Sequence, residues 1–297
     1  MSRPHTFTPP PGTRAHVLRT ARGDFAALVG EPASGPVRGT ALLVPGFTGS
    51  KEDFIALHVP LTAAGYRTVS VDGRGQYQTA GPRDDERPYA QPELARDVLA
   101  QAAALGPAKI HLLGHSLGGL IARAAVLADP APFASLTLMA SGPAAVTPAQ
   151  QQRVELLQAA LATLDLAQVL EAVQAMEAAD PADDVIEARG DEAELRERWL
   201  SNSPAQLIAT GRQLRSEPDR VDELAALALP VHVLSGERDE AWPVPLLDEM
   251  ARRLKAERTV ITGAEHSPNT DRPDETAAAL SAFWDRHPVW ADGVPHL

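Results

Sequence analysis

The sequence predicts an α/β fold with a mostly parallel central sheet, helices on both faces of the sheet and one helical insertion. Three observations support this prediction. Short apolar runs typical of strands alternate with segments whose apolar residues recur at helical spacing, and such alternation indicates crossover connections between parallel strands. The alternation stops between residues 143 and 222 and then resumes. The chain has 297 residues, which is enough for one large core with an insertion.

The first part of the chain begins with a predicted β-hairpin around Arg22-Gly23-Asp24, because residues 16–21 and 24–29 alternate apolar with other residues. Strands and helices follow in strict alternation. The predicted strands are 39–44, 66–71, 109–113 and 133–140, and the predicted helices are 51–64, 93–105 and 117–128. We therefore assign residues 1–142 to the first part of the α/β core.

Residues 143–222 break this rhythm, because they contain no run of β-branched residues typical of a strand. They show helical patterns at 154–176 and 193–200 and an acidic turn at 180–184. We predict a helical cap that lies over the carboxyl ends of the strands. Residues 223–297 then form the second part of the core. Its predicted strands are 231–235 and 259–262, and the helices predicted after the cap are 221–227, 244–255 and 273–287.

Composition excludes several classes of partner and site. The net charge of −12 and the lack of a basic stripe argue against a nucleic-acid partner. There is no cysteine, so thiol nucleophiles, disulfides and cysteine metal sites are excluded. Residues 1–20 lack the apolar core of a secretory signal, and no apolar run is long enough to span a bilayer. We expect a cytoplasmic protein without a membrane span, and the sequence specifies no oligomeric state.

The strongest motif is Gly114-His115-Ser116-Leu117-Gly118, which follows an apolar run and precedes helix-forming residues. A strand, a sharp turn that carries serine and a helix are the context of a nucleophile elbow. The turn pushes the serine backbone toward a sparsely allowed conformation, and only small residues let the neighbouring chain pass so closely. We expect Ser116 Oγ above the sheet edge, beside the unpaired N–H groups at the start of the helix.

A serine nucleophile needs a base within hydrogen-bond reach and an acid that orients this base. We expect both at the carboxyl ends of later strands, where the loops of an open α/β sheet converge. Asp239 follows the predicted strand 231–235, and His266 follows the last predicted strand. The predicted catalytic residues are therefore Ser116, Asp239 and His266.

Other residues near these positions compete for the same roles. Glu237 and Glu240 lie beside Asp239 and are alternative acids. The strand 133–140 ends in Ser141-Gly142, so no carboxylate follows it, which favours Asp239. We expect His115 to pack away from the nucleophile although it lies inside the elbow.

An acyl-transfer enzyme also needs N–H donors directed at the developing oxyanion. One predicted donor is the backbone N–H of Leu117, the residue after the nucleophile. The other is the backbone N–H of Phe47, which follows Gly46 in the loop after strand 39–44. The side chains of Phe47, Leu117 and Trp242 are candidate walls of a substrate pocket, although apolar residues in such places more often belong to the ordinary core.

The motifs together resemble the α/β-hydrolase superfamily over nearly the whole chain. They are Pro45-Gly46-Phe47, Asp72-Gly73-Arg74-Gly75, Gly114-His115-Ser116-Leu117-Gly118-Gly119, Gly236-Glu237-Arg238-Asp239 and Gly263-Ala264-Glu265-His266-Ser267-Pro268. The resemblance implies that the Asp72 segment anchors a loop. Two features depart from the family pattern: Pro45 stands where many members have histidine, and Gln76-Tyr77-Gln78-Thr79 replaces the usual glycine-containing continuation.

A serine at the elbow implies an acyl-enzyme formed from an ester, thioester, lactone or amide, with no metal or organic cofactor. The Ala- and Leu-rich insertion favours a small apolar acyl substrate, as in esterases and members similar to monoacylglycerol lipase. An alternative with the same triad is a C–C bond hydrolase or a cofactor-free haloperoxidase- or perhydrolase-like enzyme, because the scaffold alone does not select the reaction. A non-catalytic module that only binds a ligand is a further alternative, which the intact Ser, Asp and His argue against.

Overall fold

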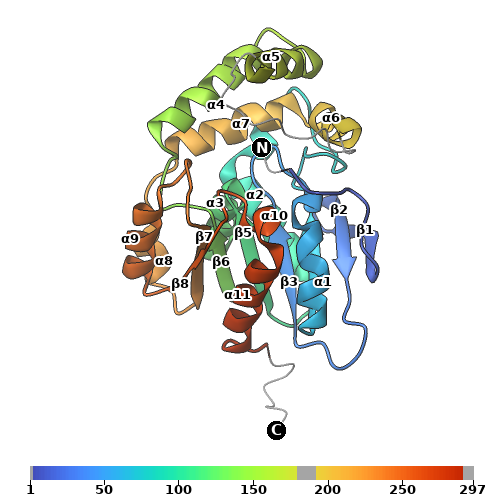
Figure 1. The fold of residues 1–297 in the computed structure, drawn as a ribbon, viewed down its shortest axis with the longest axis vertical. Helices are drawn as coiled ribbons and strands as arrows, with labels where there is room; N and C mark the ends of the chain where they lie inside the picture. Colours follow the sequence, from blue (N-terminus) through green and yellow to red (C-terminus); the bar gives the residue numbers. More distant parts are fainter. Residues whose placement is uncertain (1–2, 179–191, 290–297) are drawn as a thin grey trace.

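The computed structural model describes residues 3–178 and 192–289, and it has the mostly parallel α/β architecture that the sequence predicts (Figure 1). The predicted acidic turn at 180–184 lies outside the described residues. The described residues form one eight-stranded sheet with the order β1-β2-β4-β3-β5-β6-β7-β8. Its strands are β1 (Thr13–Thr20), β2 (Gly23–Gly30), β3 (Gly39–Val44), β4 (Tyr66–Val71), β5 (Ile110–His115), β6 (Phe133–Met139), β7 (Val231–Gly236) and β8 (Glu257–Ile261).

The pairing of the strands brings the loops of the site to one edge of the sheet. β1 pairs with β2 and β2 pairs with β4 in antiparallel fashion. Along the rest of the sheet, in the order β4-β3-β5-β6-β7-β8, each strand is parallel to its neighbour. In β5, Leu112 packs into the core on one face of the sheet and its neighbour Leu113 into the core on the other. This burial on both faces explains why the central strands read as continuous apolar runs rather than as alternating ones.

Helices cover both faces of the sheet (Figure 1). The apolar cluster on one face includes residues of α2 (Gln91–Ala104), α3 (Leu117–Ala128), α8 (Val221–Ala225) and α9 (Val244–Leu254). The cluster on the opposite face includes residues of α1 (Ile55–Ala63) and α11 (Pro273–Asp285). The remaining short helices are η1 (Lys51–Phe54), η2 (Arg87–Tyr89) and α10 (Pro268–Asp271).

Four helices between β6 and α8 form a separate layer above the end of the sheet where β5 leads into α3 (Figure 1). They are α4 (Pro148–Leu161), α5 (Leu166–Ala178), α6 (Glu192–Ser201) and α7 (Pro204–Ser216). None of the helices in the described ranges is long and apolar enough to cross a membrane.

The structure differs from the predicted helices of this layer in two places. The helical pattern at 154–176 is interrupted, because Asp165 Oδ1 accepts hydrogen bonds from the N–H groups of Ala167 and Gln168, both at 2.9 Å, and so starts α5 as a new helix. The helix α7 was not predicted. Its start carries a recognisable signal, since the Ser203 hydroxyl accepts a hydrogen bond from the N–H of Gln206 at 3.2 Å and Pro204 occupies the first turn.

Candidate active site

The structure places Ser116 in the sharp turn between β5 and α3. Its backbone has φ 54° and ψ −121°, a conformation that residues with a side chain rarely adopt. Glycines make the turn possible, because a Cβ on Gly114 would lie 2.3 Å from the Gly118 carbonyl oxygen. A Cβ on Gly118 would in turn lie 2.4 Å from the carbonyl oxygen of Val44. Ser116 consequently occupies the N-cap position of α3, where backbone N–H groups favour negative charge.

Ser116, His266 and Asp239 form a chain of hydrogen bonds. His266 Nε2 lies 3.0 Å from Ser116 Oγ, and His266 Nδ1 lies 2.9 Å from Asp239 Oδ2. The other carboxylate oxygen of Asp239 accepts hydrogen bonds from the N–H groups of Ala241 at 2.8 Å and Trp242 at 3.0 Å. Because an ionised carboxylate can only accept, Nδ1 of His266 carries the proton, and Nε2 is left to accept the Ser116 hydroxyl proton.

Asp239 differs in burial from Glu237 and Glu240, the two alternative acids. The Asp239 side chain is fully buried, whereas 35% of the His266 side chain is exposed. Glu237 is exposed, and the Glu240 carboxylate reaches Arg153 at the surface at 3.3 Å. Asp239 is therefore the acid of this cluster that contacts His266.

His115 supports the loop that carries His266. Its Nε2 donates a hydrogen bond to the His266 carbonyl oxygen at 2.8 Å, and the two rings lie 5.2 Å apart. Burial lowers the pKa of His115 to about 3, so this side chain is neutral and acts as a donor rather than as a second base. The loop after β8, which carries His266, also contacts the loop after β7, which carries Asp239, since the Glu237 N–H donates to the Ala264 carbonyl oxygen at 3.0 Å. The sequence predicted packing for His115 but not this contact.

The loop between β3 and η1 lies against the nucleophile. A Cβ on Gly46 would lie 3.1 Å from Ser116 Cβ, so only glycine fits this approach without a shift. The loop turns tightly, with Thr48 at φ 60° and a hydrogen bond from the Gly49 N–H to the Gly46 carbonyl oxygen at 3.2 Å. In the described part of the chain, the N–H groups of Phe47 and Leu117 donate to no protein acceptor. Both remain available to a ligand beside Ser116.

The three candidate pocket walls differ in exposure. Phe47 is half-buried and packs against both the main core and the apolar cluster of the helical layer. Leu117 is buried in the core at the start of α3. Its backbone N–H, rather than its side chain, is the group that remains available.

Trp242, the third candidate wall, is fully buried. Its Nε1 donates to the Ala144 carbonyl oxygen at 2.8 Å, and its ring stacks on His266 with centroids 6.2 Å apart. A Cβ on Gly142 would lie 2.0 Å from the indole ring. Trp242 therefore packs against the ring of His266 and against the loop after β6.

Three further buried histidines form hydrogen bonds within the core. His58 contacts Thr68 at 2.6 Å and Ser70 at 3.1 Å. His111 contacts Ser135 at 2.8 Å, and His232 contacts Thr259 at 2.9 Å. Burial lowers the pKa to about 4 for His58 and to about 3 for His111 and His232, so all three are neutral at neutral pH.

The segment after β4 anchors its loop, as the family resemblance implies. Asp72 is fully buried and accepts hydrogen bonds from the N–H groups of Lys51 at 2.8 Å and Gln78 at 3.1 Å. Its carboxylate also lies 3.0 Å from Lys51 Nζ. Burial raises the pKa of Asp72 to about 7, and the charge of Lys51 opposes this shift. Arg74 makes two hydrogen bonds with Asp97 on α2, both at 2.7 Å.

Arg198 joins the helical layer to η1, the short helix that follows the loop with the predicted oxyanion donor. It lies on α6, and its Nη1 lies 2.7 Å from Asp53 Oδ1. Both side chains are buried, with 2% and 0% of their surface exposed. No local pattern in the sequence predicts this pair, because a single arginine on a polar helix gives no signal for a partner so far away along the chain.

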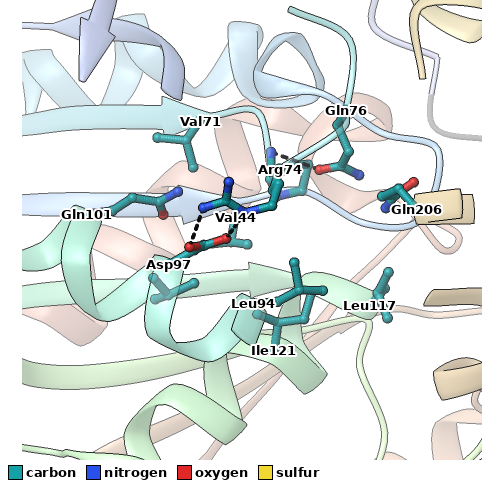
Figure 2. A pocket seen from close by; sticks show the side chains of 13 residues that line it. Val44, Val71, Arg74, Gln76, Leu94, Asp97, Gln101, Leu117, Ile121 and Gln206 are labelled. Carbon is teal, nitrogen blue, oxygen red and sulfur yellow. Dashed lines mark hydrogen bonds and ion pairs between the residues drawn. The ribbon is translucent and has the colours of Figure 1, made fainter. Parts of the chain in front are cut away.

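A small cavity of about 30 Å³ lies on the core side of the site (Figure 2). Its lining includes Pro45 and Leu117, which flank the site, and the polar side chains of Gln76, Gln101 and Gln206. Within the described ranges, the side-chain oxygens of Gln101 and Gln206 have no hydrogen-bond partner. A cavity of this volume has room for about one water molecule and is too small for an acyl substrate.

Comparison with known proteins agrees with the motifs. A family model described as the alpha/beta hydrolase family matches residues 41–279. The pimeloyl-[acyl-carrier protein] methyl ester esterase of Aeromonas hydrophila is 33% identical over 242 residues, which cover 76% of this chain and 87% of that protein. The 2-hydroxy-6-oxononadienedioate/2-hydroxy-6-oxononatrienedioate hydrolase of Paraburkholderia xenovorans is 30% identical over 214 residues, which cover 70% and 72%.

Solved structures share the fold at lower identity. A thermophilic esterase from Thermogutta terrifontis superposes with a TM-score of 0.69 at 22% identity, over 92% of this chain and 99% of that chain. The predicted fold and the predicted class, a hydrolase of ester bonds, are confirmed by the family match and by the esterase among the relatives. The chain belongs to the alpha/beta hydrolase family.

Proposed function

We propose that the protein hydrolyses carboxylic esters through an acyl-enzyme on Ser116, with His266 as base and Asp239 as the acid that orients it. The observation that supports this proposal is the hydrogen-bond chain from Ser116 Oγ to His266 at 3.0 Å and from His266 to Asp239 at 2.9 Å. The geometry is that of an activated nucleophile whose base is oriented by a buried carboxylate.

In the proposed reaction, His266 Nε2 takes the hydroxyl proton while Ser116 Oγ attacks the ester carbonyl carbon. The N–H groups of Phe47 and Leu117 donate to the oxyanion that forms. The intermediate collapses when the C–O bond breaks, and His266 returns the proton to the departing alcohol. A water molecule then attacks the acyl-enzyme by the same route, and the acid is released. Each step uses only protein groups and water.

The proposed substrate is a small ester with an apolar acyl group, bound under the helical layer. An apolar cluster shared by the four helices of this layer packs against Phe47, which precedes Thr48 in the tight loop beside Ser116. Its buried members are Leu161, Leu166, Val169, Leu170, Trp199 and Leu207. We propose that residues 143–222 act as a cap over the core segments 1–142 and 223–297. We also propose a cytoplasmic location, which fractionation of the source cells tests.

A C–C bond hydrolase is the second candidate, because one relative at 30% identity is named as a hydrolase of 2-hydroxy-6-oxo dienedioates. The same Ser116, His266 and Asp239 would serve that reaction. The apolar character of the helical layer where it packs against Phe47 favours an ester, since such dienedioates carry two carboxylates that apolar surroundings would leave without partners.

A panel of p-nitrophenyl esters of increasing acyl length tests the proposal, alongside a 2-hydroxy-6-oxo dienoate as a C–C substrate. We expect hydrolysis of short and medium esters by the wild type and none by Ser116→Ala. Cleavage of the dienoate with no ester hydrolysed would select the C–C reaction. Inactivity on both substrates, with folded protein, would contradict both candidates.

A further inference from the structure

We propose that Gln76 is a positioning residue that aims the N–H of Phe47 at the oxyanion, an inference that rests on the proposed ester hydrolysis. Gln76 belongs to the segment that departs from the family pattern. Its side chain is buried, with 4% exposed, and its Nε2 donates a hydrogen bond to the Gly46 carbonyl oxygen at 2.9 Å. This contact joins the loop after β4 to the peptide unit that carries the predicted oxyanion donor.

The contact acts on the donor because the Gly46 carbonyl and the Phe47 N–H belong to the same peptide unit. The unit is planar, and the described residues contain no cis peptide bond, so the N–H points opposite to the carbonyl. Whatever holds the carbonyl oxygen in place therefore sets the direction of the N–H. Two donors reach this oxygen, the Gln76 amide and the Gly49 N–H at 3.2 Å. Both also polarise the peptide, which strengthens the Phe47 N–H as a donor.

The local chain does not fix the orientation of this peptide by itself. Glycine at position 46 is required by the close approach to Ser116, and glycine tolerates many backbone conformations. The residue that brings the loop near Ser116 thus also gives the peptide plane more freedom to rotate than another residue would. The Gly49 N–H from within the loop and the Gln76 amide from outside it limit this freedom, and Gln76 supplies the shorter of the two hydrogen bonds.

Gln76 is itself held in one orientation (Figure 2). Its Oε1 accepts a hydrogen bond from the Gly73 N–H at 2.9 Å. Because Gly73 N–H can only donate and the Gly46 carbonyl can only accept, the two ends of the amide are assigned without ambiguity. The loop is tight here, since a Cβ on Gly73 would lie 2.5 Å from Gln76 Oε1. The buried Asp72 anchors the start of this loop to Lys51.

The substitution Gln76→Glu tests the role with little change in shape. A glutamate oxygen can still accept from the Gly73 N–H, but the ionised carboxylate cannot donate to the Gly46 carbonyl, and a methionine at this position cannot donate at any pH. Gln78→Glu is the matched control, because it adds the same charge two residues away on an exposed side chain. Steady-state kinetics with a p-nitrophenyl ester would be combined with inhibition by an alkyl trifluoromethyl ketone, whose hemiketal mimics the oxyanion.

We expect Gln76→Glu to lower kcat by about 10- to 100-fold, less than the complete loss of one oxyanion donor, while KM changes little. The ketone should bind more weakly by a similar factor. The pH profile of kcat/KM should keep its shape, since Gln76 contacts no member of the Ser116–His266–Asp239 chain. Gln78→Glu should behave as the wild type. If Gln76→Glu fails to fold, the uncharged Gln76→Met should show the same loss of kcat.

Wild-type kcat and ketone affinity in a folded Gln76 variant would overturn the positioning role. A rise in KM with kcat unchanged would also overturn it, because the residue would then act on substrate binding alone. A wild-type enzyme that hydrolyses no ester would instead overturn the proposed function, and the positioning role with it. The two failures are thereby distinguished by the wild-type measurement.

Discussion

Asp239 orients His266 through a carboxylate that has no contact with solvent. One of its oxygens faces His266 Nδ1, and the other accepts two backbone N–H groups from the turn that follows. These hydrogen bonds engage both carboxylate oxygens and leave no second orientation for the side chain. The position of His266, the proposed base, therefore depends on a side chain that is closed off from solvent.

We expect Asp239→Asn to lower kcat by about four orders of magnitude, because an amide in this place favours the wrong tautomer of His266. Ester hydrolysis by the purified variant measures the effect. Glu240→Gln is the control, since this carboxylate lies at the surface beside Arg153. Asp239 would not be the acid if its variant kept wild-type kcat while Glu237→Gln or Glu240→Gln lost it.

Trp242 illustrates what the sequence could not predict for a single residue. A tryptophan three residues after the acid is close enough to the site to be considered a wall. Its burial depends on Gly142, because only glycine leaves room for the indole ring, and on a hydrogen bond to Ala144. Those residues follow β6, far away in the sequence, so no local pattern indicates the contact.

Buried histidines in α1, β5 and β7 make stability depend on pH. The folded-state pKa values of His58, His111 and His232 lie at about 4, 3 and 3, below the ordinary value of 6.5. The unfolded chain therefore binds protons in this range that the folded chain does not. The folded state is therefore most stable, as far as these three histidines are concerned, above about pH 6.5, where they are neutral in both states. It loses stability as the pH falls toward the folded-state pKa values, because protons then bind to the unfolded chain.

We expect the free energy of unfolding to fall steeply between about pH 6.5 and about pH 4. His232→Gln should reduce that slope by up to about 1.4 kcal/mol per pH unit, the contribution of one proton. Urea unfolding at several pH values measures it. His16→Gln serves as the control because His16 is exposed on β1, and an equal change of slope in both variants would contradict the assignment to the buried ring.

The helix α6 is tied to the core by the buried pair of Arg198 and Asp53. Burial raises the pKa of Asp53, and the charge of Arg198 opposes this shift, so each ion depends on its partner. The carbonyl oxygen of Asp53 also accepts a hydrogen bond from Asn269, three residues after the predicted base. The pair thus lies between the helical layer and the loop of His266.

We expect Arg198→Met to destabilise the protein by about 3–5 kcal/mol, because it leaves a buried carboxylate without its partner. The double variant Arg198→Met with Asp53→Asn should recover part of this loss, since the uncompensated charge is removed as well. The free energy of unfolding of the wild type, the two single variants and the double variant, measured by heat or urea, gives a double-mutant cycle. If the two effects are simply additive, the two side chains do not interact.

At the scale of the whole molecule, the sequence predicts the sheet better than the helical layer. Strands buried on both faces, such as β3 and β5, are mostly apolar, and the glycine-containing motifs that follow them indicate the loop of Phe47 and the turn of Ser116. The helices α4 and α5 are separated by the Asp165 cap, and α7 packs in a layer whose apolar side is shared with Phe47. Such shared packing weakens the periodicity of each helix, so their boundaries were harder to predict.

Contacts between loops that are far apart in the sequence could not be predicted either, because they too depend on how the elements pack. Gln76 and Gly46 lie on loops that follow different strands, and only the pairing of β3 with β4 brings these loops together. The departure of the Gln76 segment from the family pattern was visible, but its consequence depended on the three-dimensional arrangement. The three residues of the hydrogen-bond chain, Ser116, His266 and Asp239, could be named from the sequence, whereas most residues that hold them in place could not.

The most direct test of the central claim is covalent labelling by a fluorophosphonate, followed by mass spectrometry of the intact protein and its peptides. We predict one adduct per chain in the folded wild type, located on Ser116, and none in Ser116→Ala. His266→Ala should still fold and label far more slowly, because the serine has lost its base. A folded wild type that does not react, or that carries the adduct on another residue, would contradict the account.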